Sequence, residues 1–186
     1  MEICTVHIRH LLNESFLHNY REGECHRKTL PFFSLVQALE GEYSIRLNDG
    51  AEYFTGTGGF FIAPSYVQQT IVHHASEGTM SARWIFMDAV LNDLYPFDRY
   101  YRFPVVITGQ AAARLSLCMD SVFAAKTLYG KYGAAYEVLE TLSLLSEPRE
   151  DGDPDETMYR MLQYLEDHYR ENITMQSLAQ HAMQSE

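Results

Sequence analysis

Short apolar segments separated by strong turn signals are the feature of this sequence that most limits its fold. Residues 31–39 are rich in aromatic and aliphatic side chains, and residues 43–48 alternate between apolar and polar side chains. The first pattern is typical of a buried strand and the second of a strand with one polar face. Asn48-Asp49-Gly50 then predicts a tight turn, because Asp-Gly tolerates the positive φ that hairpins require.

Four further strands are predicted downstream, each bounded by turn residues. We expect them at residues 51–55, 59–63, 67–74 and 79–88. Pro64 ends the second of them, since proline cannot donate to a strand ladder. Arg46 lies among polar residues of its strand and is expected to face solvent. Short strands at this regular spacing predict a sandwich or a small barrel.

From Thr108 onward, the apolar residues recur at helical spacing. A first apolar stripe comprises Leu115, Cys118, Met119, Val122 and Phe123. Residues 129–133 are expected to interrupt the helix. A second stripe ends before Pro148 and comprises Val138, Leu139, Leu142 and Leu145. Two such helices can bury their stripes on the barrel, on each other or across a dimer axis.

The C-terminal residues predict a linker followed by helices. Residues 147–156 are acidic, contain Pro and Gly and lack apolar anchors, as is typical of a linker. Helical spacing resumes at Met158, Met161, Leu162, Leu165 and Tyr169. Thr174 can cap a further helix, in which Leu178 and Ala179 share one face. Ser185 is expected to cap the helix after that.

These C-terminal residues resemble the start of the DNA-binding domain of AraC-type transcription regulators. The match comprises Ile173, Thr174, residues 178–181 and Ser185, the pattern that opens the first of that domain's two helix-turn-helix units. The strand series is similar to the cupin sensor domain of the same family, which is a double-stranded β-helix. That second match comprises Arg27, residues 39–42, residues 59–64, Trp84 and Phe86.

The resemblance implies a mainly β fold with C-terminal helices, divided into four parts. We expect a cupin-like effector-binding barrel at residues 1–107, a helical dimerisation segment at 108–147, a linker at 148–156 and the truncated start of a helix-turn-helix domain at 157–186. Leu178, Ala179 and Ser185 mark that last part. A homodimer is also implied, because paired DNA half-sites need two copies. The expected dimer-interface residues are Leu115, Met119, Val122, Leu139, Leu142 and Leu145.

A small barrel can hold one ligand in its interior, and the sequence around Trp84 predicts part of the lining. If Trp84 faces inward, Ala82 and Phe86 do so too, by the two-residue period of a strand. The alternative is a tryptophan that only fills the core. Arg27 can offer a guanidinium fork to carboxylate or hydroxyl groups, unless it lies on the surface.

Two uncharged residues complete the predicted binding site. Gln68 and Thr70 share one strand face and can hydrogen-bond a ligand, with surface exposure as the alternative. The effector is expected to be a small molecule, either a sugar, an aromatic compound or an organic acid. The predicted effector-binding residues are Arg27, Gln68, Thr70, Ala82, Trp84 and Phe86.

The sequence predicts neither a metal centre nor catalysis. A cupin metal site needs several His and a carboxylate, often with a His-x-His pair on one strand. His73 and His74 are adjacent and therefore point to opposite faces of a strand. The sequence contains no Gly-x-Ser-x-Gly elbow and no phosphate-binding glycine loop. We therefore expect no catalytic residues, no metal and no cofactor.

Composition limits the partners and the compartment. The net charge of −11 opposes direct DNA binding by these residues, because DNA-binding surfaces carry clustered Lys and Arg. Cys4, Cys25 and Cys118 lie at unrelated spacings, which predicts reduced thiols in a cytoplasmic protein. No apolar run approaches the length of a membrane span. The expected function is the ligand-sensing and dimerisation portion of a bacterial AraC-family DNA-binding regulator. A stand-alone cupin binding protein or cupin enzyme is the alternative.

Overall fold

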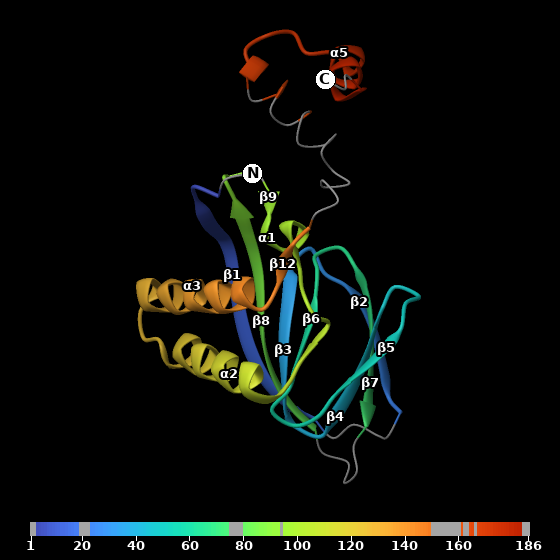
Figure 1. Ribbon diagram of the computed structural model, residues 1–186, viewed down its shortest axis with the longest axis vertical. Coiled ribbons are helices and arrows are strands. Elements are labelled where there is room, and N and C mark those ends of the chain that lie inside the picture. The colour runs from blue at the N-terminus through green and yellow to red at the C-terminus, as the bar shows by residue number, and fades with distance from the viewer. Residues whose placement is uncertain are drawn as a thin grey trace.

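Two antiparallel sheets face each other and form a barrel, with helices on the outer side of the larger sheet (Figure 1). The computed structural model describes residues 3–18, 23–74, 80–93, 95–149, 161, 164–165 and 167–183. The predicted mainly β fold with C-terminal helices is confirmed, and the two sheets form the expected cupin-like barrel.

The larger sheet has six strands in the order β1-β8-β3-β6-β11, with β9 paired to β8. These strands are β1 (Val6–His18), β3 (Phe33–Glu40), β6 (Phe60–Ala63), β8 (Met80–Leu91), β9 (Tyr95–Pro96) and β11 (Val106–Ile107). Strand β8 runs three residues beyond its predicted end at 88, because it pairs with β1 from Val6↔Leu91 to His18↔Met80.

The smaller sheet has four strands in the order β2-β7-β4-β5. These are β2 (Cys25–Thr29), β4 (Glu42–Leu47), β5 (Glu52–Thr55) and β7 (Gln68–His74). The predicted strands at 43–48, 51–55 and 67–74 are thus confirmed to within a residue or two, and Arg46 is exposed as expected. In the described part, β1 and β2 are edge strands, and no ladder joins one to the other.

The larger sheet separates two apolar cores, because neighbouring residues on its strands point to opposite faces. Leu35 and Ile85 lie in a core shared with the helices. Val36 and Ala82 lie in a second core inside the barrel. The barrel interior is therefore walled on one side by the same strands that support the helical layer on the other.

Helices α2 (Gly109–Ala124) and α3 (Leu128–Leu144) cover the outer face of the larger sheet (Figure 1). The predicted interruption at residues 129–133 is wrong, because α3 already begins at Leu128. Thr127 caps this helix, and its Oγ1 accepts a hydrogen bond from the Gly130 N–H at 3.1 Å. That cap overrides the weak helix propensity of the glycines at 130 and 133.

The structure corrects the predicted dimer-interface residues. Leu115, Met119, Val122, Leu139 and Leu142 are all at most 3% exposed, and they pack in the core of their own chain. Leu145 is half-buried against the same core. The barrel supplies the apolar surface that these stripes need, so they pack mainly against their own chain.

The start of the predicted linker is held by a short ladder. Strand β12 (Glu147–Pro148) pairs with β10 (Tyr101–Arg102), which follows the short helix α1 (Phe97–Tyr100). The rest of the predicted linker, residues 150–156, lies outside the described residues.

Helix α5 (Met175–Met183) contains residues 178–181, the central part of the C-terminal match. Thr174 Oγ1 accepts a hydrogen bond from the Ser177 N–H at 3.1 Å, as predicted for a cap. Leu178 is buried and Ala179 is exposed, while Ser185 lies outside the described residues. No helix in the described ranges is both long and apolar enough to cross a membrane.

Candidate functional site

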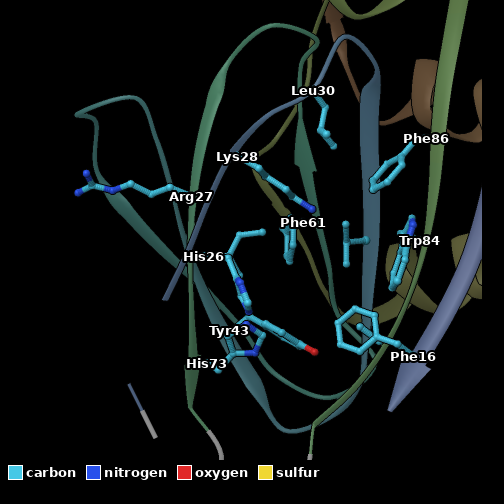
Figure 2. A pocket seen from close by; sticks show the side chains of 13 residues that line it. Phe16, His26, Arg27, Lys28, Leu30, Tyr43, Phe61, His73, Trp84 and Phe86 are labelled. Carbon is cyan, nitrogen blue, oxygen red and sulfur yellow. The ribbon is translucent and has the colours of Figure 1, made fainter. Parts of the chain in front are cut away.

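A cavity of about 340 Å³ lies inside the barrel, between the two sheets (Figure 2). Its walls are mostly aromatic and aliphatic. The strands of the larger sheet contribute Phe16, Val36, Phe61, Ala82, Trp84 and Phe86. The other side is formed by His26, Arg27, Lys28, Leu30, Tyr43, Ile71 and His73.

Three aromatic side chains form a continuous wall on the side of β1 and β8. The rings of Phe16 and Trp84 lie 4.8 Å apart between centroids, and those of Trp84 and Phe86 are stacked at 6.0 Å. Ala82 precedes them on the same face of β8, where its small side chain leaves room for a ligand. The two-residue period thus places Ala82, Trp84 and Phe86 together on the cavity, as predicted.

Imidazole and phenol groups gather on the opposite side of the cavity. His26 and His73 are in edge contact at 4.7 Å between ring centroids, and the ring of Tyr43 lies 5.0 Å from that of His73. His74, the neighbour of His73, faces the other way, and its Nε2 lies 3.0 Å from Ser44 Oγ. The prediction that the two adjacent histidines point to opposite faces is confirmed.

Lys28 brings a cationic group into this apolar cavity. Its Nζ lies 5.2 Å from the centroid of the Phe86 ring, and Figure 2 shows the side chain directed into the cavity. Burial lowers the pKa of the Lys28 ammonium below its ordinary value of 10.5. None of the described carboxylates forms an ion pair with it.

Gln69 is a further polar residue on the inward face of the smaller sheet. It lies directly opposite Lys28 in the ladder between β2 and β7, and it shares a strand face with Ile71 and His73, which line the cavity. Gln69 is 0% exposed. Within the described residues, neither its amide nitrogen nor its amide oxygen has a hydrogen-bond partner.

Three of the predicted effector-binding residues do not present their side chains to the cavity. Arg27 borders it, but its side chain points away (Figure 2). Gln68 is exposed and Thr70 half-buried, and both lie on the outer face of β7. The strand alternation places their neighbours inward, so these three side chains take the outward position that the sequence left open as the alternative for each of them.

Sequence reasoning missed several residues of the cavity. Phe16, His26 and Lys28 lie on β1 and β2, which were not predicted as strands. On β2, burial alternates from Cys25 to Thr29. An outward Arg27 would therefore have placed His26 and Lys28 inward, and this alternation was the available signal.

The donor groups of the cavity do not fit a cupin metal centre. Among the described residues, no group of three His, Cys, Asp or Glu side chains gathers at one point. His26 and His73 are the two imidazoles of the cavity lining, which contains no carboxylate. The Lys28 ammonium in the same cavity would repel a metal cation.

A polar cluster links the outer face of β8 to α2. Arg83 Nε donates to Gln37 Oε1 at 2.7 Å, and the guanidinium forms an ion pair with Asp120 at 2.5 Å. It also donates to Ser116 Oγ at 3.0 Å. The Arg83 side chain is only 12% exposed. The cavity wall and the helical layer are therefore joined through β8.

Comparisons with known proteins are informative at the level of fold. No protein-family model and no curated protein matches the chain. The crystal structure of the AraC-like transcriptional activator CuxR is similar, with a TM-score of 0.57 at 11% identity, over 94% of this chain and 67% of that protein. Smaller parts are similar to Bacillus subtilis oxalate decarboxylase (TM-score 0.34, 15% identity, 40% of this chain and 21% of that one). The Clostridium difficile EutQ protein is similar at a TM-score of 0.35 and 11% identity, over 44% of this chain and 67% of that protein. The chain thus shares its overall fold with the AraC-like activator.

Proposed function

We propose that this chain is the ligand-sensing and dimerisation portion of an AraC-family transcription regulator. The observation that carries the proposal is the aromatic cavity enclosed by the barrel. It is supported by the similarity of fold to an AraC-like activator over 94% of the chain. A small-molecule effector would occupy the cavity and alter DNA binding by a helix-turn-helix domain that begins within residues 157–186. The role of the barrel is to bind the effector, without making or breaking a covalent bond.

The route from cavity to helices runs through β8. Trp84 faces the cavity, whereas Arg83 holds Ser116 and Asp120 of α2. A ligand that favours one position of β8 would thereby favour one position of α2. The effector then acts by shifting the population between two arrangements, which requires that it bind one of them more tightly.

Dimerisation would use the outward face of the helical layer. Tyr129, Tyr136 and Leu144 recur at intervals of about two turns on α3, and Leu117 lies on the side of α2 opposite Leu115. These four side chains are between 40% and 90% exposed. We name them the helical outer stripe, and we propose that two copies of the chain pair through it.

The experiment that tests the sensing function uses the tryptophan of the cavity. Trp84 is the only tryptophan of the sequence, so its fluorescence reports on this site alone. A panel of sugars, aromatic compounds and organic acids is titrated into the protein, and the response and the compound are followed over time. Saturable quenching with the compound recovered unchanged supports a sensor. Conversion of the compound into a product would instead establish the alternative, a cupin enzyme.

A further inference from the structure

The cavity has the chemistry of a site for a small aromatic carboxylate. Resting on the proposed function, we infer that Lys28 neutralises the carboxylate of such a ligand and that the ring lies against Phe16, Trp84 and Phe86. The side chains named here are on the cavity lining. The inference selects one of the ligand classes that the sequence left open and assigns the residue that recognises it.

The Lys28 ammonium has no anion beside it among the described residues. An ammonium in an apolar cavity loses hydration, and that loss is compensated only when an anion lies close to it. The ammonium contacts the face of Phe86, with Nζ 5.2 Å from the ring centroid. A ring face attracts a cation more weakly than a carboxylate does. The cavity therefore favours a ligand that carries a negative charge.

The side-chain amide of Gln69 is a further hydrogen-bond donor beside Lys28. Gln69 lies opposite Lys28 across the β2–β7 ladder, and its amide is fully buried without a described partner. Directly opposite residues of such a ladder have Cβ atoms about 4.5–5.5 Å apart. A carboxylate has two oxygens that accept from two donors. Gln69 is not among the residues that line the cavity, so the ammonium is the group that meets the carboxylate, and the Gln69 N–H is a neighbouring donor on the same inward face.

The aromatic wall of the cavity favours a particular shape and polarity in the rest of the ligand. Phe16, Trp84 and Phe86 present ring faces and edges, which favour a flat aromatic partner in stacked or edge contact. A sugar carries hydroxyl groups around its whole ring, and each would lose its water against these apolar walls. The cavity of about 340 Å³ is at the small end of the range for ligand sites. A single substituted ring fits these limits better than a sugar.

The test compares two probes of nearly the same shape, benzoate and neutral benzamide, by quenching of Trp84 fluorescence. Benzoate is expected to bind the wild-type protein about tenfold or more tightly than benzamide, because a hydrogen bond to a charged group is stronger. Lys28→Met should lose that preference, with benzoate weakened and benzamide unchanged. Lys28→Arg should retain it, because the positive charge remains.

Arg27→Met is the matched control. It removes the same charge from the adjacent residue of the same strand, but the Arg27 side chain points away from the cavity. The inference requires that benzoate binding survive Arg27→Met and fall in Lys28→Met. Equal binding of benzoate and benzamide by the wild-type protein would overturn it, as would equal losses in the two variants. If Lys28→Met is unfolded by circular dichroism, the wild-type probe pair and Lys28→Arg still decide.

The same titrations separate this inference from the proposed function. If a sugar or another neutral compound quenches Trp84 saturably and benzoate does not, the cavity is a sensor of another ligand class and only the inference fails. If no compound of the panel changes either the fluorescence or the Tm, the sensing function fails with it.

Discussion

Arg83 and Trp84 are neighbours on β8, and their side chains lie on opposite faces of the larger sheet. Trp84 lines the cavity, whereas Arg83 forms an ion pair with Asp120 of α2. Because the two residues are adjacent on one strand, a shift of the β8 backbone would move both side chains. This pair makes β8 a physical connection between the cavity and the helices.

Arg83→Met should destabilise the protein by about 1–3 kcal/mol. The variant removes the donor to Gln37 Oε1 and leaves that buried amide oxygen without this partner. Urea unfolding followed by far-UV circular dichroism measures the change. Arg114→Met, on an exposed position of the same helical layer, is the control and should change the unfolding free energy by less than about 0.5 kcal/mol. Equal losses in the two variants would contradict the role assigned to the cluster.

Lys28→Met should raise the Tm of the ligand-free protein at pH 7. The methionine removes a desolvated ammonium, and a gain of about 1 kcal/mol corresponds to roughly 2–4 °C in a chain of this size. The folded-state pKa of Lys28 is lowered below 10.5, so the wild-type protein regains stability as pH rises from that folded-state pKa toward 10.5.

The difference in Tm between Lys28→Met and the wild type should therefore shrink at high pH. Differential scanning calorimetry at pH 7 and pH 10 measures it, with Arg27→Met as the reference for a change in surface charge. A difference that grows between pH 7 and pH 10 would show that the ammonium is not the destabilising group.

Gln69→Leu should stabilise the ligand-free protein by about 1 kcal/mol or more. The amide is fully buried without a described partner, and an apolar side chain of similar size avoids the cost of its desolvation. Gln68→Leu makes the same substitution on the exposed face of the same strand and should give no gain. Chemical unfolding of both variants decides. A loss of stability in Gln69→Leu would mean that the amide is satisfied in solution.

Leu144→Glu combined with Leu117→Glu should shift a dimer toward monomer. Both residues belong to the helical outer stripe and are 66% and 69% exposed, so the charges are tolerated by the folded chain but not in an apolar interface. Sedimentation velocity at tens of micromolar measures the change. Leu12→Glu, at a 51% exposed position of β1, is the control. A wild-type protein that sediments only as monomer would rule out the proposed pairing.

The sequence was sufficient for the strands that carry strong patterns and insufficient for those at the edges. Strands β3 to β7 were predicted because their apolar runs end in clear turns. Strand β1 was missed because, as an edge strand, it is buried mainly at Ile8 and Leu11, and its other positions are polar or exposed. With β1 and β2 missing, Phe16 and Lys28 could not be assigned to the cavity.

The remaining differences between prediction and structure concern which residues of β7 face inward and which surface the helices pack against. On β7, two adjacent glutamines gave no indication of which one faces inward, so Gln68 was chosen where the structure places Gln69 on the cavity face. On the helices, the stripes through Leu115 and Leu142 were read correctly as apolar. Periodicity alone does not reveal whether such a stripe meets its own barrel or a second chain, and here it meets the barrel.

The edge positions of β1 and β2 have a mechanical consequence. Each strand is hydrogen-bonded along one side only, and no ladder in the described part connects them. Because no ladder crosses between them, a small change in their separation would break no backbone hydrogen bond of the two sheets. Such a movement would be small and collective and would require no local unfolding.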